Sequence, residues 1–339
     1  MSKILVTGGL GYIGSHTVVE LIQAGYEPLV IDNLSESDIE VKDRIEQIVG
    51  KEILFEQVEM CNIEELQALF KKYNIAGVIH FAAFLLVNES VADPLKYYHN
   101  NLVSTTNLLR VMLEHRVYNI VFSSSCTVYG NPDELPVTEN ASIQPAVSPY
   151  GNTKKIGEDI LKDTAAATDL KVISLRYFNP IGAHESALIG EFQDGEPHHL
   201  VPYITETAFG IRKELKVFGD DYNTPDGSCV RDYIHVVDVA KAHISAVQRM
   251  LDGKTEDSFE VFNLGMGVGV SVLEMIEAFK EATGIEIPYS IAPRREGDVE
   301  AVYADTTKAN TVLGWKTGKS LKDAMGDAWR WEKAVRGKD

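Results

Sequence analysis

The sequence predicts an α/β fold in which helices cover both faces of a doubly wound parallel sheet, followed by a smaller lobe of mixed structure. Three observations support this prediction. Strand-like and helix-like runs alternate over about the first 180 residues, which is typical of parallel sheets. The first strand-like run ends in a glycine-rich turn that leads into a helix-like run. The 339 residues exceed the size of a usual single core, so we expect a domain at residues 1–180 and a lobe at 181–339.

The expected elements follow one another regularly through the first half of the chain. Short β-rich runs predict strands near residues 3–7, 27–32, 53–59, 76–81, 119–125 and 171–177. Helices are expected between them near 12–24, 38–49, 63–73, 94–115 and 150–167. The second half has helix patterns near 201–212, 271–283 and 320–335 and loop signals at 182–184, 190–197 and 219–227. The strand-like residues 261–264 predict that a segment near 235–265 returns to the sheet.

The glycine-rich turn predicts a nucleotide site. Gly8, Gly11 and Gly14 directly follow the first strand-like run. They let the backbone turn sharply and approach a pyrophosphate, which then faces the N-terminus of a helix. The next strand-like run ends in Asp32, 18 residues beyond Gly14, where a carboxylate can hold the hydroxyls of an adenosine ribose. No arginine follows Asp32 closely enough to meet a 2′-phosphate, so the sequence predicts NAD rather than NADP.

Tyr150 and Lys154 predict a base that works at neutral pH. They stand four residues apart after Pro149, which suits a helix start, and so share one helix face. An unperturbed tyrosine titrates near ~10, so this use requires a drop of about 3 units, or roughly 4 kcal/mol. A lysine ammonium about 4 Å away in a partly screened site contributes on the order of 4 kcal/mol. The alternative is an ordinary surface helix that carries both residues by chance.

The composition excludes several classes of function. The net charge of −18 argues against a nucleic-acid partner, because a duplex-binding surface needs clustered lysine and arginine. No run approaches the roughly 18 to 20 apolar residues of a membrane span, and no basic region precedes an apolar core at the N-terminus. Cys61, Cys126 and Cys229 are odd in number and widely spaced, which argues against disulfides and structural zinc and predicts buried thiols. We expect a cytoplasmic protein without a metal site.

Six motifs resemble those of the UDP-glucose 4-epimerase family of extended short-chain dehydrogenases/reductases. They stand in the family's order and cover nearly the whole chain: residues 7–14 (TGGLGYIG), 123–130 (SSSCTVYG), 150–154 (YGNTK), 176–183 (RYFNPIGA), 230–238 (VRDYIHVVD) and 293–298 (PRREGD). The first and third fit any member of the superfamily, whereas the six together are specific. The resemblance implies a Rossmann-type domain with a small C-terminal lobe that binds a UDP-sugar. It also implies an NAD cofactor kept through the cycle, UDP-hexose substrates and a homodimer.

The resemblance further implies a reaction, the interconversion of UDP-glucose and UDP-galactose. Tyr150 as phenolate takes the proton of the sugar 4-hydroxyl while hydride leaves C4 for the nicotinamide. Ser125 hydrogen-bonds the same oxygen, and Lys154 also bonds the nicotinamide ribose. The 4-keto sugar then turns over in the pocket, so that hydride returns to its opposite face. The competing interpretation of Ser125 is a turn donor in a serine-rich strand end.

The motif positions carry over as two sets of binding residues. The cofactor set is Gly8, Gly11, Tyr12, Ile13, Gly14, Asp32, Asn33, Glu59, Met60, Phe81, Ala82, Ala83, Asn100, Ser123, Tyr150, Lys154 and Tyr177. The substrate set is Ser125, Phe178, Asn179, His199, Leu200, Phe218, Arg231, Tyr233, Arg295, Asp298 and Val302. The resemblance assigns the diphosphate and ribose to Arg231 and Arg295, since a guanidinium fork suits phosphate oxygens. The alternatives are a pair of Arg231 with Asp232 or Asp238, and a solvated charge cluster at Arg295.

Four positions bear on how far the resemblance extends. Leu85 stands where the family usually has a lysine near the cofactor, and Glu59 where an aspartate commonly meets adenine. His199 stands where an asparagine holds the nucleotide sugar. Val302 falls where the family gates the size of the 2-substituent, with a tyrosine in strict UDP-glucose enzymes. Its small side chain predicts that UDP-GlcNAc and UDP-GalNAc are also turned over, unless Val302 merely fills a core space.

Three other functions stay open on the sequence. A nucleotide-sugar 4,6-dehydratase would carry an acidic pair beside the catalytic serine, where residues 124–127 read SSCT. A net reductase or dehydrogenase would change the amount of free NADH. A non-catalytic NAD-binding protein usually lacks the catalytic tyrosine or lysine, whereas this chain has both Tyr150 and Lys154. His80 and His235 are interpreted as structural histidines, and His198 with His199 as part of a loop rather than as metal ligands.

Overall fold

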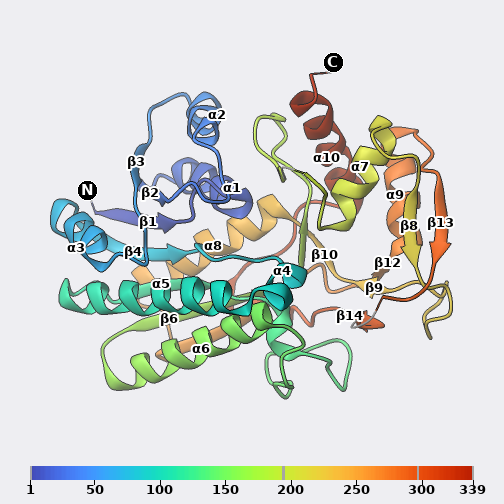
Figure 1. Ribbon diagram of the computed structural model, residues 1–339. Helices are drawn as coiled ribbons and strands as arrows, with labels where there is room; N and C mark the ends of the chain where they lie inside the picture. Colours follow the sequence, from blue (N-terminus) through green and yellow to red (C-terminus); the bar gives the residue numbers. More distant parts are fainter. Residues whose placement is uncertain (1, 193–194, 296–297, 338–339) are drawn as a thin grey trace.

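The computed structural model describes residues 2–192, 195–295 and 298–337. Its centre is a seven-stranded sheet with the strand order β11-β6-β5-β4-β1-β2-β3 (Figure 1). The strands are β1 (Lys3–Thr7), β2 (Pro28–Asp32), β3 (Leu54–Gln57), β4 (Ile75–His80), β5 (Asn119–Ser123), β6 (Lys171–Tyr177) and β11 (Phe259–Leu264). Neighbouring strands of this sheet pair in parallel. The fold class predicted from the sequence is confirmed.

Helices cover both faces of the sheet (Figure 1). One face packs against α1 (Tyr12–Gln23), α2 (Glu40–Val49) and α8 (Val236–Leu251). The other packs against α3 (Ile63–Lys72), α5 (Pro94–Glu114) and α6 (Pro149–Ala167), with the short α4 (Val87–Ala92) just before α5. Successive strand residues point to opposite faces, so Val6 lies in the first apolar cluster and Leu5 in the second. Both faces of the sheet are therefore apolar and buried, as a parallel sheet requires.

Local sequence signals explain where several helices begin. Asn62 accepts a hydrogen bond from the backbone of Glu64 at the start of α3, and Ser148 accepts one from Gly151 at the start of α6. Pro149, which follows Ser148, has no N–H that the helix would leave unpaired. Capping boxes start α9 (Val272–Thr283) and α10 (Leu321–Val335). Side-chain oxygens thus satisfy the free N–H groups of these first turns.

The C-terminal lobe combines helices with small sheets. Helices α7 (Leu200–Phe209), α9 and α10 enclose a separate apolar cluster. The small sheets contain β7 (Asn179–Ile181) with β10 (Tyr233–His235), β8 (Leu215–Phe218) with β13 (Tyr289–Ala292), and β9 (Val230–Arg231) between β12 (Val270–Ser271) and β14 (Ala301–Val302). A further cluster joins the turn η1 (Cys126–Tyr129) to β14 through Val128, Phe178 and Val302. The lobe therefore packs on the sheet next to the end of β5.

The structure differs from the sequence-based expectation at α8. Residues 236–251 form a helix of 16 residues, and no helix was expected there. The helix is rich in β-branched residues and largely buried, because it packs against α1 and the sheet. The helical periodicity is nevertheless present in the sequence, because Lys241, Ser245 and Gln248 form a polar stripe opposite the buried side, and it was not recognised. It leads into β11, which lies beside β6 at the sheet edge.

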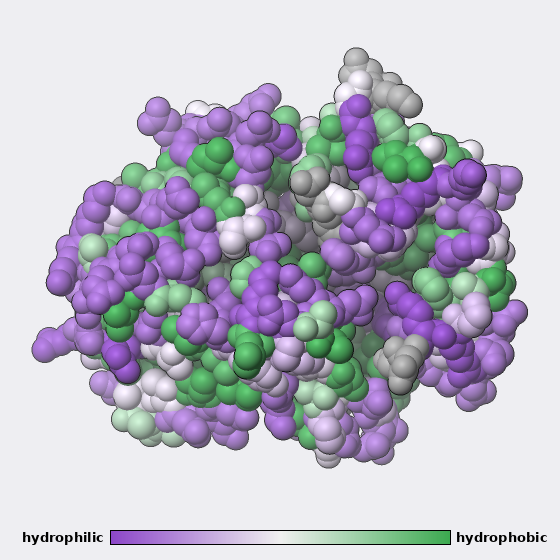
Figure 2. Space-filling view, viewed as in Figure 1, coloured by the Kyte–Doolittle hydropathy of each residue, from purple (hydrophilic) through white to green (hydrophobic). Residues whose placement is uncertain are grey.

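The order of the strands places a crevice above the sheet. The chain runs from β1 through β2 to β3 on one side and continues from β4 on the other. In such sheets ligands bind beyond the carboxyl ends of the strands where this reversal occurs. The largely hydrophilic surface is hollowed where the sheet domain meets the lobe (Figure 2). Across the described residues, no helix combines the length and the apolar character that a membrane crossing requires.

Candidate active site

The turn after β1 has room for glycine alone at two positions. Gly8 adopts a positive φ of 65°, and a Cβ there would meet Ala82 N at 2.8 Å. A Cβ on Gly14 would meet the Gly8 carbonyl oxygen at 2.2 Å. Gly11 caps α1 without a side chain, so no cap side chain occupies the N–H groups of the first helical turn, which includes Tyr12 and Ile13. These groups and the helix dipole form a cradle that fits a pyrophosphate.

Asp32 ends β2 beside this turn, and its carboxylate is already oriented. Oδ2 accepts from Leu10 N at 3.1 Å, and Oδ1 accepts from Leu34 N at 3.0 Å and from Ser37 Oγ at 2.8 Å. Asn33, the next residue, donates to Glu59 Oε2 at 2.8 Å. This hydrogen bond joins the segment after β2 to the segment after β3, where the adenosine is expected to bind. Glu59 reaches this place although it replaces the usual aspartate.

The segment after β4 forms the opposite wall of the crevice. Phe81 N donates to the Thr7 carbonyl at 3.1 Å, and Phe84 N donates to Asn101 Oδ1 at 2.9 Å. Leu85 is 49% exposed. Lys96, in the first turn of α5, lies with its Nζ 4.2 Å from the centre of the neighbouring Phe84 ring and donates to Glu89 Oε1 at 2.6 Å. The sequence interpretation did not single out Lys96, which lies outside the six motifs.

The catalytic residues expected from the sequence meet at the end of β5. Tyr150 and Lys154 share one face of α6. Lys154 Nζ donates to the Ser123 carbonyl at 2.7 Å, and Ser125 lies close enough to Tyr150 to act on the pKa of its phenol, in the lowering direction. The hydroxyls of Ser123 and Tyr177 are also hydrogen-bonded to each other. Ser125 Oγ also accepts from the Thr127 backbone at 3.2 Å, so its possible turn role and a catalytic role are compatible.

The electrostatics of the pair differ from the sequence-based expectation. Burial raises the pKa of Tyr150 to about 12, against a lowering effect of the hydrogen bond from Ser125. Burial also lowers the pKa of Lys154 to about 8, while the nearby Glu158 carboxylate acts in the opposite direction. The expected drop in the pKa of Tyr150 is therefore wrong. The physical reason is that burial disfavours the charged form of both groups, and the ammonium is directed at a backbone carbonyl.

The lobe brings several expected substrate residues together in pairs. Arg295 donates from Nε to Asp298 Oδ2 at 3.0 Å and from Nη2 to Oδ1 at 3.2 Å. The Arg295 guanidinium also lies 4.6 Å from the centre of the Phe218 ring. Glu296 and Gly297 of the same motif lie outside the described residues. The arginine is held in place by a carboxylate and a ring and keeps a side chain that is 58% exposed.

Strand pairing aligns the remaining residues of the lobe. Val302 stands beside Arg231 in the β14–β9 pair, and Asn179 stands beside Tyr233 in the β7–β10 pair. Arg231 Nη1 donates to the Val230 carbonyl at 2.9 Å. Asp232 instead accepts from the backbone of Met266, Gly267 and Ala304. Asp238 accepts from the backbone of Gly318 and Lys319. Within the described ranges, neither aspartate forms an ion pair with Arg231.

His199 and Leu200 stand at the start of α7. His199 Nδ1 contacts a Glu191 carboxylate oxygen. This carboxylate raises the pKa of His199 above its usual value, against the effect of burial. The imidazole is thus biased towards its cationic form, which the family's asparagine cannot adopt. Leu200 is partly buried and packs against the apolar cluster of the lobe.

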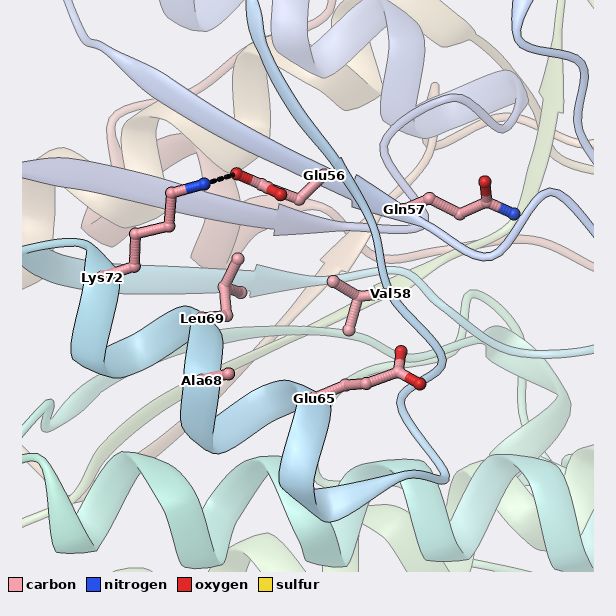
Figure 3. Close-up of a pocket in the computed structure, with 7 residues that line it drawn as sticks. All are labelled: Glu56, Gln57, Val58, Glu65, Ala68, Leu69 and Lys72. Carbon is pink, nitrogen blue, oxygen red and sulfur yellow. Dashed lines mark hydrogen bonds and ion pairs between the residues drawn. The ribbon is translucent and has the colours of Figure 1, made fainter.

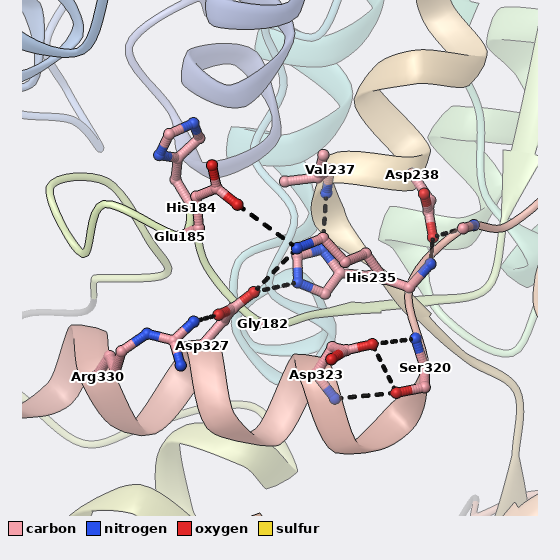
Figure 4. Close-up of polar contacts among 12 residues, drawn as sticks. Gly182, His184, Glu185, His235, Val237, Asp238, Ser320, Asp323, Asp327 and Arg330 are labelled. Atoms are coloured by element: carbon pink, nitrogen blue, oxygen red, sulfur yellow. Dashed lines mark hydrogen bonds and ion pairs between the residues drawn. The ribbon is translucent and has the colours of Figure 1, made fainter.

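The two histidines interpreted as structural are buried in satisfied networks. His80 shares hydrogen bonds with Thr7 Oγ1 at 2.8 Å and Thr105 Oγ1 at 3.1 Å. His235 Nδ1 accepts from Val237 N, and its Nε2 lies 3.1 Å from Asp327 Oδ2 (Figure 4). Burial lowers the pKa of His235 to about 4. In the part of the chain that is described, no group of three or more His, Cys, Asp or Glu side chains could hold a metal ion.

Another surface pocket lies apart from these residues. It is formed between β3 and α3, and its lining includes Glu56, Glu65 and Lys72 (Figure 3). Lys72 Nζ donates to Glu56 Oε1 at 2.5 Å, so these two charges satisfy each other. The pocket contains none of the residues that carry redox or phosphate chemistry. We therefore assign the candidate site to the crevice at the ends of β1, β4 and β5.

The three cysteines differ in how accessible their thiols are. Cys61, Cys126 and Cys229 are free, and only Cys229 is fully buried. The expectation that all three thiols are buried is therefore wrong for Cys61 and Cys126, which are partly accessible. Cys126 directly follows Ser125 and packs against the cluster that contains Val302. Burial raises the pKa of the Cys126 thiol to about 12, against the lowering effect of Arg231, so it remains protonated.

Comparisons with known proteins agree with this arrangement. The family described as GDP-mannose 4,6 dehydratase matches residues 5–327. A curated UDP-glucose 4-epimerase of Dictyostelium discoideum is 52% identical over 97% of this chain and 95% of the relative. A solved UDP-glucose 4-epimerase from Stenotrophomonas maltophila, with bound NAD and formylated UDP-arabinopyranose, is 46% identical with a TM-score of 0.96 and 99% of each chain covered. The UDP-glucose 4-epimerase of Bifidobacterium longum, in complex with NAD+ and UDP, is 45% identical with a TM-score of 0.94 and 100% of each chain covered.

Proposed function

The chain belongs to the UDP-glucose 4-epimerase family, and we propose on this basis that it is an NAD-dependent isomerase that interconverts UDP-glucose and UDP-galactose. One observation carries the proposal. Tyr150, Ser125 and Lys154 meet at the end of β5, beside a glycine cradle that fits a pyrophosphate. One crevice thus contains both a residue that can accept a proton from a carbinol and a site that can bind a dinucleotide.

We propose that different parts of the crevice bind different parts of the cofactor. Asp32, with Asn33, Glu59 and Met60 nearby, would hold the adenosine. The backbone of the cradle would hold the pyrophosphate, and the opposite wall consists of Phe81, Ala82, Ala83 and Asn100. Ser123, Lys154 and Tyr177 would adjoin the nicotinamide ribose. NAD, when bound, supplies the reversible acceptance of a hydride and a positive charge on its oxidised ring.

The charge balance explains how Tyr150 becomes a base. Lowering its pKa from about 12 to near 7 requires roughly 7 kcal/mol. An ammonium such as that of Lys154 supplies on the order of 4 kcal/mol at about 4 Å. The remainder of roughly 3 kcal/mol matches a second nearby positive charge. We therefore infer that Tyr150 needs two nearby positive charges, the Lys154 ammonium and an oxidised nicotinamide ring, to act as a base near neutral pH.

The proposed roles of the substrate residues follow from their chemistry. Tyr150 accepts the proton of the 4-hydroxyl, and Ser125 holds the same oxygen. Arg231 and Arg295 would bind the diphosphate and ribose. Asp298, Phe218, Tyr233, Phe178, Asn179, His199 and Leu200 would surround the nucleotide. Binding energy concentrated on the UDP leaves the 4-keto hexose free to turn, and this turn allows inversion at C4.

The two parts of the molecule would divide this work. We propose that residues 1–180, with the returning segment near 235–265, bind the cofactor, and that the rest of 181–339 binds the UDP-sugar. Val302 is 8% exposed and lies in the apolar cluster beside Phe178. Its small side chain supports turnover of UDP-GlcNAc and UDP-GalNAc, whereas its burial in this cluster fits the alternative that it fills a core space. Activity on UDP-galactose with none on either N-acetyl sugar would refute this proposal about Val302.

We also propose a homodimer that works in the cytoplasm. Val87 and Val91 on α4 and Leu95 at the start of α5 are 44%, 62% and 78% exposed. Exposed apolar side chains of this kind suit an interface with a second copy. Three free thiols suit a reducing compartment. Sedimentation of the purified protein at several concentrations tests the dimer.

One experiment separates the proposed function from its alternatives. The purified protein is incubated with UDP-glucose, UDP-galactose and their N-acetyl analogues without added cofactor, and the products are separated. An epimerase converts each accepted sugar to its C4 epimer with no net change in free NADH. A net reductase or dehydrogenase consumes or releases NADH, a 4,6-dehydratase yields a 4-keto-6-deoxy sugar, and a non-catalytic NAD-binding protein yields no product.

A further inference from the structure

Glu158 lies one helical turn beyond Lys154 on the same face of α6. The residue is buried, with 7% exposure, below the catalytic residues. Its Oε1 accepts hydrogen bonds from the hydroxyls of Ser124 at 2.6 Å and Ser174 at 2.7 Å. Arg176 donates from Nε to Oε1 at 2.9 Å and from Nη2 to Oε2 at 2.5 Å. A buried carboxylate is thereby fully paired and fixed in one orientation.

Three side chains on this face of α6 engage three consecutive serines, residues 123–125, at the end of β5. Lys154 donates to the carbonyl of the first serine at 2.7 Å. Glu158 accepts from the hydroxyl of the second at 2.6 Å. Tyr150 lies close to the third, whose side chain acts to lower the pKa of the phenol. The helix therefore aligns with the strand end through a contact at every serine, and the catalytic serine is the last of the series.

We propose that Glu158, held by Arg176, is a positioning residue that fixes Ser124 and thereby aims the adjacent Ser125 hydroxyl at Tyr150. This proposal rests on the proposed epimerase function. A buried ion pair contributes little net stability compared with apolar residues of the same volume, but it imposes a defined geometry. Geometry matters here, because a displacement of about 1 Å in a catalytic group can reduce a rate about a hundredfold.

The surroundings of Glu158 support a role beyond packing. The backbone N–H of Ser124 is held by the carbonyls of Phe122 and Leu175, each at 3.0 Å. The hydroxyl of Ser124 on Glu158 is thus a second attachment of this residue, in addition to its backbone N–H, and Ser125 follows it directly in the chain. The Arg176 guanidinium is itself held, 4.8 Å from the centre of the Tyr129 ring. Arg176 thus contacts both Glu158 and Tyr129, while its Nη1 is buried without a hydrogen-bond partner.

Two serines that bind the same oxygen supply a matched pair of variants. Ser124→Ala and Ser174→Ala each remove one buried hydroxyl from Glu158 Oε1, but only Ser124 is covalently next to the catalytic serine. We expect Ser124→Ala to lower kcat for UDP-galactose about tenfold, with KM and bound NAD unchanged. Ser174→Ala keeps kcat close to wild type, although both variants lower Tm by similar amounts. Equal effects of the two variants on kcat would overturn the positioning role.

A second readout does not depend on turnover. The Cζ resonance of Tyr150 in protein labelled with ¹³C-tyrosine, assigned through Tyr150→Phe, reports the titration of this phenol. The hydrogen bond from Ser125 favours the ionised form. Misdirecting Ser125 therefore raises the Tyr150 titration midpoint in Ser124→Ala and leaves it unchanged in Ser174→Ala. An unchanged midpoint in both variants overturns the proposal even if the wild type is inactive, whereas an inactive wild type with the expected midpoints refutes only the epimerase function.

Discussion

Replacing Lys154 with methionine tests the charge balance of the site. The substitution removes the ammonium and keeps a flexible side chain of similar length. Burial raises the pKa of Tyr150 to about 12, so at pH 7 roughly one phenol in 10⁵ would be ionised without help. An ammonium at about 4 Å favours the phenolate by on the order of 4 kcal/mol. We therefore expect Lys154→Met to lower kcat roughly a thousandfold at pH 7.

The assay is a pH–rate profile of UDP-galactose epimerisation. In Lys154→Met the ionised fraction of Tyr150 grows about tenfold for each pH unit below its pKa. The rate of the variant should therefore rise steeply towards pH 10, whereas the wild-type rate should no longer increase there. Lys155→Met, at the next position of α6, is the matched control and should retain most of the wild-type rate. A rate for Lys154→Met within tenfold of wild type at pH 7, or a flat profile, would refute the reasoning.

Two further predictions concern the cofactor cradle and the substrate loop. Gly14→Ala places a Cβ 2.2 Å from the Gly8 carbonyl and should abolish copurifying NAD. Gly326→Ala in α10, whose Cβ would meet nothing closer than 3.7 Å, should keep the NAD and be neutral or slightly stabilising; equal NAD contents would contradict the steric argument. The Glu191 carboxylate raises the pKa of His199, so its positive charge is present at low pH and lost as pH rises through this raised pKa. KM for the UDP-sugar should therefore increase with pH in the wild type but not in His199→Asn, with His198→Asn as the control; a parallel increase in all three would exclude His199.

Features encoded by local sequence could be predicted well. The strand that ends in Asp32, the glycine turn and the start of α6 at Pro149 each depend on neighbouring residues. Turn chemistry, helix capping and burial act over a few positions. The same holds for the shared face of Tyr150 and Lys154, which follows from helical spacing alone. These features carry the fold class and the cofactor site.

Features that depend on burial or on distant partners could not be predicted in the same way. α8 is an exception, because its polar stripe at Lys241, Ser245 and Gln248 was present in the sequence and was not recognised. The high pKa of Tyr150 was missed because the cost of burying a charge depends on the packed surroundings. The buried pair of Glu158 with Arg176 joins α6 to β6, and no short motif contains both residues. The only local signal was the position of Glu158, one turn beyond Lys154.

The central claim is that Tyr150 is the base of an epimerase. The most direct measurement compares Tyr150→Phe with wild type for turnover of UDP-galactose, bound NAD and Tm. Loss of a general base costs typically 10²–10⁴-fold, so the account predicts a fall in kcat of at least about a hundredfold, with NAD and Tm close to wild type. A fully active Tyr150→Phe protein with its NAD in place would contradict the account.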